Sequence, residues 1–188
     1  MRWEQLFEDL ESQLEQLSLA ERDAEIADRT RAELARVSTL DRLRASVGRT
    51  ITCSLSDGAV VRGRLNRVGA DFVLVTRAHG ETVVPLSAME LLEGLCEGAV
   101  SEDVAGRVVS RLGLTTVLRS LARDRSALQL RVGAGRGLVG TVQRVGSDFL
   151  QLAVHEPEES PRPGTVRATP LVPLARLVSV ERVTEPIP

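Results

Sequence analysis

Several residue types are scarce or absent in this 188-residue sequence, and each shortage argues against a class of function. Tyrosine is absent, and the aromatic residues are Trp3, Phe7, Phe72 and Phe149. Proteins that bind single-stranded nucleic acid by base stacking need several aromatic side chains, so this mode of binding is disfavoured. Lysine is absent as well, whereas the sequence contains 24 arginines. Either codon bias or a use of guanidinium groups for phosphate contacts explains this choice.

Cysteine and long apolar runs are also scarce. Cys53 and Cys96 are the two cysteines, and they lack the CxxC spacing of zinc and redox sites. We therefore expect reduced structural thiols and no metal site. No apolar run reaches the roughly 18–20 residues that cross a bilayer, and residues 1–9 are too charged for a signal peptide. These features predict a cytoplasmic protein without a membrane partner.

Catalytic motifs are missing too. The sequence contains no nucleophile elbow, phosphate-binding loop or dinucleotide fingerprint. His79 and His155 fall in or beside predicted hairpin loops, where a proton-transfer pair is conceivable but a solvated side chain is the more common outcome. The glycine-rich residues 133–137 fall in a turn between strands rather than before a helix, which argues against a phosphate cradle. We predict that the protein is not an enzyme and holds no cofactor.

The charge is unevenly distributed, although the formal net charge is only −2. Residues 1–46 contain 7 arginines and 11 acidic residues, and residues 47–100 contain 5 and 6. Residues 101–188 contain 12 arginines and 9 acidic residues. An acidic N-terminal segment therefore precedes a mildly basic C-terminal half, which could contact phosphate groups or an acidic partner.

Part of the sequence occurs twice. Residues 63–73 read GRLNRVGADFV, and residues 140–150 read GTVQRVGSDFL. Downstream, residues 84–86 and 172–174 both read VPL. The second copy is longer between these matches, which predicts an exposed hairpin insert at about residues 154–167 that is rich in proline and charge. Matching ends around a variable loop are typical of duplicated domains.

Each copy is predicted to form short β-strands, because apolar and polar residues alternate with a period of two. In the first copy we expect strands at residues 50–55, 60–68, 72–76, 82–86 and near 90–95. Gly63, inside the second of these strands, indicates a bend or bulge. Asp71 and Asp148 recur in equivalent turns, where they are expected to hydrogen-bond the local backbone or, alternatively, a shared ligand.

A helical segment is predicted over residues 1–38. Its first part carries an apolar stripe with alternating steps of four and three residues, formed by Trp3, Phe7, Leu10, Leu14 and Leu17. The stripe either packs on the rest of the protein or docks a partner helix. The predicted domains are the segment 1–38, the first copy with its leading helix at 39–98, and the second copy with its leading helix at 99–184.

The glycine spacing of each copy resembles that of Sm-like (LSm) proteins. These proteins carry a glycine, four residues and a second glycine at the second strand, and Gly58 and Gly63, like Gly135 and Gly140, have this spacing. The resemblance, which SH3-like barrels share, implies an α+β, mainly β fold. This fold consists of two tandem Sm-like (SH3-like) five-strand barrels, each preceded by a helix, after the N-terminal helical segment. The arrangement also resembles an uncharacterised protein family of high-GC Gram-positive bacteria.

Two properties of Sm-like proteins bear on function. Their barrels often form rings by pairing exposed edge strands, so the resemblance implies pairing between the two barrels or with other chains. Their RNA-contacting turn carries an aspartate six positions after the second glycine and an asparagine four positions later. Gly69 and Val73 stand there in the first copy, and Gly146 and Leu150 in the second. The implied fold is therefore kept as an expectation, whereas the RNA site is not carried over.

Two functions are open from the sequence. The first is a non-enzymatic protein–protein interaction or scaffold module, with a protein partner or self-association, favoured by the nearly neutral charge and the apolar stripe. The alternative is a divergent nucleic-acid-binding (RNA) regulator, favoured by the resemblance and the basic C-terminal half. The candidate residues for nucleic acid or an acidic partner are Arg62, Arg64, Arg67 and Arg144. No small-molecule substrate is evident.

An oligonucleotide titration separates these two functions. The interaction-module hypothesis predicts no measurable binding of mixed RNA and DNA oligonucleotides at low salt. The nucleic-acid hypothesis predicts binding that weakens steeply with salt, because phosphate contacts release counterions. In that case, substitutions that remove the charges of Arg62, Arg64, Arg67 and Arg144 should weaken it. Fluorescence anisotropy at two salt concentrations distinguishes the outcomes.

Overall fold

The computed structural model describes residues 12, 21–22, 25–100, 112–156 and 166–183. Its contacts divide the chain into two compact units, residues 1–38 and residues 39–188. In the first unit residues 25–34 are helical, and their side chains are exposed. Within the described part of the chain, no helix has both the length and the apolar character needed to cross a lipid bilayer.

The first half of the second unit contains a short helix and five strands. Helix α2 spans Thr39–Ala45 and precedes the strands. A 3-10 helix, η1 (Leu86–Ala88), joins the fourth strand to the fifth. The strands are β1 (Thr50–Leu55), β2 (Val60–Val68), β3 (Phe72–Arg77), β4 (Gly80–Pro85) and β5 (Met89–Glu93). These bounds agree with the strands predicted for the first copy to within a few residues.

The second half has the same order of elements. Helix α3 (Leu114–Asp124) precedes the strands, and η2 (Leu174–Arg176) joins the last two. The strands are β6 (Ala127–Val132), β7 (Arg136–Val145), β8 (Phe149–Val154), β9 (Leu171–Pro173) and β10 (Leu177–Arg182). Most of the predicted hairpin insert, residues 157–165, lies outside the described residues. On either side of it, Glu156 and Arg167 form an ion pair at 2.7 Å.

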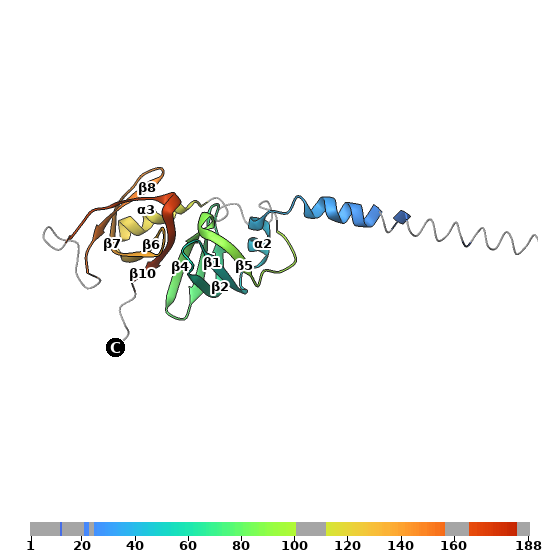
Figure 1. The fold of residues 1–188 in the computed structure, drawn as a ribbon, viewed down its shortest axis with the longest axis horizontal. Helices are drawn as coiled ribbons and strands as arrows, with labels where there is room; N and C mark the ends of the chain where they lie inside the picture. The colour runs from blue at the N-terminus through green and yellow to red at the C-terminus, as the bar shows by residue number, and fades with distance from the viewer. Residues whose placement is uncertain (1–11, 13–20, 23–24, 101–111, 157–165, 184–188) are drawn as a thin grey trace, which may run out of the picture. The chain divides into compact units, whose positions relative to one another are not determined.

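All ten strands belong to one antiparallel sheet in the order β5-β1-β2-β3-β4-β10-β6-β7-β8-β9 (Figure 1). The two halves meet where β4 pairs with β10, with Val83 opposite Val180 and Thr82 opposite Glu181. The predicted fold of two tandem Sm-like five-strand barrels is therefore wrong, although the mainly-β class is confirmed. The reason is that the free edge of β4 is satisfied by a strand of the other half, so the strands continue as one open sheet.

Alternating apolar and polar residues explain the two faces of the strands. In β1 the side chains of Ile51, Cys53 and Leu55 are buried, and the intervening side chains are more exposed. This pattern is expected for a strand with one face on a core. Cys53 therefore faces the core, and burial raises the pKa of its thiol to about 11. Cys96 is partly buried, and both thiols are free.

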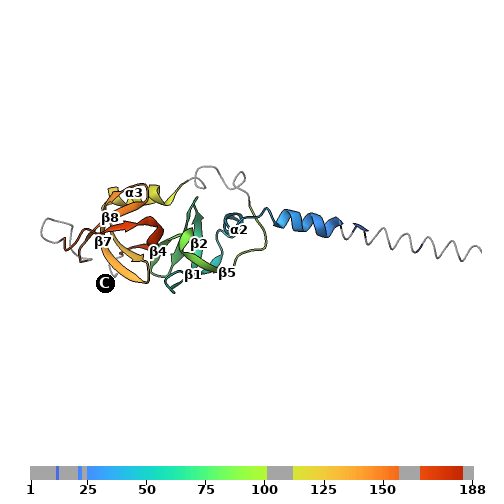
Figure 2. The ribbon, with the colours of Figure 1, turned by 45° about the horizontal axis from the view of Figure 1, so that its top comes forward.

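Two hydrophobic cores lie along the sheet, and each contains side chains of the other half. The core of the first half contains Leu43 of α2 and also Val178 of β10. The core of the second half lies under α3 and contains Phe72 of β3 and Val83 of β4. Helix α3 packs beside β7 (Figure 2). Because each half buries side chains of the other, the two halves pack as one unit.

Glycines at equivalent positions of the two copies are required by close backbone contacts. A Cβ atom at Gly63 would overlap the main-chain oxygen of Thr76, and a Cβ atom at Gly140 would overlap that of Ala153. Both β2 and β7 also contain a bulge a few residues after this glycine. The predicted irregularity of the second strand is therefore confirmed, and such bulges increase the local twist of the sheet.

The variant Gly140→Ala is expected to lower the free energy of unfolding by about 1–3 kcal/mol, because the added methyl group must displace the main chain of β8. The matched control is Gly137→Ala on the same strand, where a Cβ atom meets nothing within 4 Å. The control should change stability by less than about 0.5 kcal/mol. Urea denaturation followed by circular dichroism measures both, and equal stability of the two variants would contradict this role of Gly140.

Candidate interaction surface

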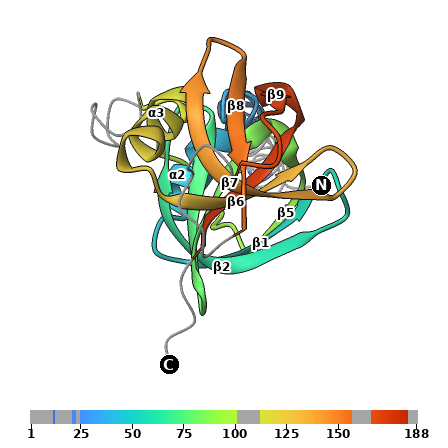
Figure 3. The same ribbon diagram turned by 90° about the vertical axis from the view of Figure 1, so that its left-hand side faces the viewer.

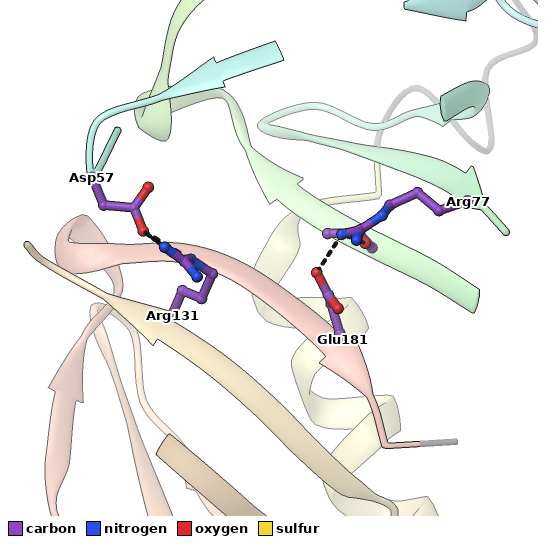
Figure 4. Close-up of polar contacts among 5 residues, drawn as sticks. Asp57, Arg77, Arg131 and Glu181 are labelled. Atoms are coloured by element: carbon purple, nitrogen blue, oxygen red, sulfur yellow. Dashed lines mark hydrogen bonds and ion pairs between the residues drawn. The ribbon is translucent and has the colours of Figure 1, made fainter. Parts of the chain in front are cut away.

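The contact between β4 and β10 is reinforced by two ion pairs that join the halves (Figure 4). In the first pair, Asp57 lies in the turn between β1 and β2, and Arg131 lies on β6. The Nε and Nη2 atoms of Arg131 lie 2.8 and 2.7 Å from Asp57 Oδ2. The Asp57 side chain is fully buried, whereas Arg131 is partly exposed. This pair fastens a turn of the first half to the second half.

The surroundings of Asp57 favour its charged form. Burial by itself raises the pKa of this carboxyl group, but the Ala59 amide donates a hydrogen bond to Oδ1 at 3.0 Å. Arg131 adds a further hydrogen bond and a positive charge. Together these contacts lower the pKa of Asp57 below its ordinary value of 3.8.

The second ion pair lies on the strands themselves. Arg77, at the end of β3, donates from Nη1 to Glu181 Oε1 of β10 at 2.9 Å and to the Thr82 hydroxyl at 3.4 Å. The pair therefore spans β4, which lies between β3 and β10. Both charged side chains are partly exposed, so the pair contributes only about 0–1 kcal/mol to stability. Its main consequence is to favour one register between the halves.

Asp71 links the turn between β2 and β3 to helix α3. Its Oδ1 atom accepts a hydrogen bond from Leu114 N at 2.6 Å, and Ala70 N donates to the main-chain oxygen of Leu112 at 3.0 Å. A carboxylate at this place satisfies an amide that has no partner within the helix. The prediction that Asp71 bonds its local backbone is therefore wrong, because its carboxylate caps a helix of the other half.

The equivalent turn of the second half has the same main-chain geometry, and Arg119 of α3 donates a hydrogen bond to the main-chain oxygen of Gly146 there at 3.3 Å. Gly146 N donates to the main-chain oxygen of Phe149 at 2.8 Å, as the equivalent amide does in the first half. Asp148 is exposed. Among the described residues, its carboxylate accepts one hydrogen bond, from the Ser147 hydroxyl at 3.4 Å. The carboxylate of Asp148 is therefore an acceptor equivalent to that of Asp71, but it faces solvent.

Apolar side chains that are buried on β3 and β4 have more exposed counterparts on β8 and β9. Val83 of β4 is 8 % exposed, whereas its counterpart Leu171 of β9 is 58 % exposed. Phe72 of β3 is 5 % exposed, whereas its counterpart Phe149 of β8 is only partly buried. We name the surface formed by Asp148, Phe149 and Leu171 the β8–β9 face. Figure 3 shows its two strands side by side.

Among the described residues, no strand pairs with the outer edge of β9. β9 is an edge strand that pairs with β8. The carbonyl oxygen of Pro170 accepts a hydrogen bond from Leu152 N at 3.1 Å and so points toward β8. Neighbouring residues of a strand direct their main-chain N–H and C=O groups to opposite sides. The N–H and C=O groups of Leu171 therefore point away from β8. Pro173 does not prevent pairing, since its counterpart Pro85 ends β4, which pairs with β10.

The opposite edge strand, β5, differs in its charge. Leu91 on this strand is 56 % exposed, but Glu90 and Glu93 are exposed acidic residues. Glu90 holds the position that corresponds to Val178 of β10, which is buried in the core of the first half. Charged side chains on an edge strand oppose the addition of another strand. β5 is therefore a protected edge, whereas β9 is not.

The four arginines singled out from the sequence lie on two separate strands. Arg62, Arg64 and Arg67 are exposed residues of β2, and Arg144 is an exposed residue of β7. The strands β3, β4, β10 and β6 lie between β2 and β7 in the sheet. Arg64 Nε donates to the main-chain oxygen of Gly48 at 3.1 Å. A role for these arginines in binding stays a prediction.

The apolar stripe proposed for partner docking lies outside the described residues. Its members are Trp3, Phe7, Leu10, Leu14 and Leu17. In the described part of the same unit, Ile26 and Leu34 are large apolar side chains that are exposed on the helical residues 25–34. The role of the stripe therefore stays a prediction.

His155 has a different environment from the one predicted. Its side chain is buried, with Nε2 2.9 Å from the Thr141 hydroxyl and Nδ1 2.7 Å from the main-chain oxygen of Glu156. Because a carbonyl oxygen can only accept, Nδ1 carries a proton and donates it to Glu156. The expected solvated position is therefore wrong for His155, whereas His79 is exposed. Among the described residues no cluster of histidine, cysteine and acidic side chains is suited to hold a metal ion.

Sequence reasoning missed the residues that join the halves. A scan against protein-family models and a search of curated proteins found no match, so the surface is assigned from its geometry. One signal was present in the two copies themselves. Arg131 corresponds to Ser54 and Asp57 corresponds to Ala134, so neither member of this ion pair has a charged counterpart in the other copy. Charges that the copies do not share point to a contact between them.

The variant Asp57→Asn is expected to lower the free energy of unfolding by about 1–3 kcal/mol at pH 7, because Arg131 loses a charged hydrogen-bond partner. The pKa of Asp57 is lower in the folded than in the unfolded protein, so its charge stabilises the fold above the unfolded pKa. This stabilisation is lost as the pH falls through the folded pKa. Wild type and variant should therefore begin to converge as the pH falls below 3.8, and they should meet only below the folded pKa.

Urea denaturation at pH 7 and pH 3 measures this difference. The matched control is Asp124→Asn, which removes an ion pair with Arg182 in which both side chains are exposed. The control should change stability by less than about 1 kcal/mol. A difference between Asp57→Asn and wild type that stays constant over this pH range would contradict the assigned role of the charge.

Proposed function

We propose that this protein is a non-enzymatic protein–protein interaction module whose β8–β9 face binds a partner polypeptide. The contrast between Val83 and Leu171 carries the proposal, because equivalent side chains are buried at the junction and exposed on β9. The surface of β4 that packs against the second half thus has an exposed counterpart on β9, at an edge of the sheet. An edge strand with an exposed aliphatic side chain favours strand addition.

The partner is expected to supply an apolar strand to β9. At the junction Val180 of β10 lies opposite Val83 of β4, and both are buried. A partner strand would place an apolar side chain beside Leu171 in the same way. Main-chain hydrogen bonds would supply affinity, and the side-chain contacts would supply specificity. Asp148 would accept a hydrogen bond from the start of a partner helix, as Asp71 does from Leu114.

A different protein is favoured over a second copy of this chain. In a second copy, β10 is already paired on both sides, with β4 and β6. The equivalent strand that has a free edge is β5. That strand carries Glu90 where β10 carries the buried Val178. Burying a carboxylate without a positively charged partner is costly. The preferred partner strand therefore has an aliphatic residue at this position.

A distant relationship to Sm-like proteins is part of the proposal. The glycine spacings at Gly58 and Gly63 and at Gly135 and Gly140 support it. The pairing of the halves through β4 and β10 also supports it, because Sm-like proteins associate through edge strands. The RNA-binding alternative, a cytoplasmic location and the absence of catalysis stay predictions.

A peptide of residues 174–183 is a suitable probe, because it contains β10, the strand that pairs with β4. Added to the full chain, it is expected to shift the NMR amide signals of Phe149 and Leu171 in a saturable manner. A control peptide with lysine in place of Val178 and Val180 should cause no such shifts, because charged side chains cannot enter the apolar contact.

Two variants of the full chain test the position of binding. Leu171→Arg is expected to weaken binding of the peptide by about fivefold or more, which corresponds to about 1 kcal/mol. The matched control is Val60→Arg, since Val60 is 60 % exposed but lies on β2, which pairs on both sides. Equal affinity of both variants for the peptide, or shifts at β5 instead of β9, would show that the proposal is wrong.

A further inference from the structure

A pocket of about 330 Å³ lies on the junction of the two halves, between α3 and the sheet. Six aliphatic side chains form its wall: Leu74, Val83, Val117, Leu121, Leu128 and Val180. They come from β3 and β4 of the first half and from α3, β6 and β10 of the second. The pocket therefore exists because β4 pairs with β10, and each half supplies part of its wall.

The wall of the pocket suits a saturated apolar group. The described side chains that line it include no aromatic ring for stacking a base and no hydroxyl or amide for binding a sugar. Its volume lies at the lower end of the roughly 300–1,000 Å³ of small-molecule sites. An alkyl chain gains free energy here in proportion to the apolar area removed from water.

The lining of the pocket includes one acidic side chain, Glu81, that forms no ion pair with the described residues. Arg182 also lines the pocket. Arg182 is paired with Asp124 at 3.1 Å, and the neighbouring Arg77 is paired with Glu181 at 2.9 Å. Glu81 accepts a hydrogen bond from the neutral amide of Asn66 at 3.1 Å. The charge of Glu81 is thus available to a ligand.

We propose that this pocket binds a saturated aliphatic chain that ends in a primary ammonium group. The chain packs against the aliphatic wall, and the ammonium group donates hydrogen bonds to the Glu81 carboxylate. Two sources present this chemistry, a free alkylamine and the N-terminal residue of a polypeptide with an aliphatic side chain. The proposal does not depend on the β8–β9 face, because it uses different residues.

Such a ligand would contact both halves of the chain at once. Leu74 and Val83 belong to the first half, and Val117 and Leu128 belong to the second. A ligand that binds only when the halves are joined stabilises the joined state by mass action. Binding is therefore expected to raise the thermal midpoint of unfolding as the ligand concentration rises.

Three probes of equal chain length test the proposal on the full chain: n-hexylamine, n-hexanol and n-hexanoate. Isothermal titration calorimetry gives the affinities, and NMR shifts of the methyl groups of Val117 and Leu128 locate the site. We expect hexylamine to bind about three- to tenfold more tightly than hexanoate, with hexanol between them. Equal or tighter binding of hexanoate, or no saturable binding of hexylamine, would overturn the proposal.

Two variants connect the affinity to the pocket. Glu81→Gln should remove the preference for hexylamine over hexanoate, whereas the matched control Glu90→Gln, an exposed acid on β5, should retain it. Val117→Phe should weaken all three probes, because the larger ring fills part of the pocket. Unfolding midpoints without ligand show that each variant is folded. Hexylamine binding that is unchanged in Val117→Phe would place the site elsewhere and overturn the proposal.

The source of the ammonium group is distinguished by two peptides. Leu-Ala-Ala amide presents a free N-terminus next to an aliphatic side chain, and its N-acetylated form does not. Tighter binding of the free peptide than of hexylamine identifies a polypeptide N-terminus as the ligand, and the reverse order identifies an alkylamine. Equal binding of the free and acetylated peptides would contradict the role of the ammonium group.

Discussion

The pairing of β4 with β10 is the contact on which the rest of this structure depends. Two opposed residue pairs join the strands directly, which by itself is a small contact. The pairing is stabilised because Val83 is buried in the core of the second half and Val178 in the core of the first. The cap that Asp71 provides for α3 and the buried pair of Asp57 and Arg131 cross the same junction. Neither core is complete without the other half.

Local features could be predicted from the sequence because they depend on neighbouring residues in the chain. Alternation located β1 and β2, and the repeated glycines Gly63 and Gly140 indicated where the backbone comes close and bulges. The order of the strands could not be predicted in this way. Val83 and Val180 are far apart in the sequence, and the same alternation occurs whether an edge strand closes a barrel or joins a second half.

The candidate site was harder to predict than the strands. In the sequence Arg131 and Arg77 look no different from Arg62, yet the first two form ion pairs across the junction and the last is exposed on β2. Periodicity also cannot show that Leu171 is uncovered while Val83 is buried, because both are apolar residues of equivalent strands. Differences between the copies carry part of this information: Asp57 and Arg131 have uncharged counterparts, whereas Asp71 and Phe72, which also meet the other half, occur in both copies.

The two edges of the sheet differ in a way that limits assembly. A contact from β9 of one chain to β5 of the next would repeat along a fibre or close into a ring. Glu90 on β5 opposes this contact, because its carboxylate would enter the site that Val178 occupies in β10. β9 carries Leu171 and no charged residue, and the neighbouring strand β8 begins with Phe149. Each chain therefore offers one apolar acceptor and one protected edge, which suits binding of a single partner rather than growth of a fibre.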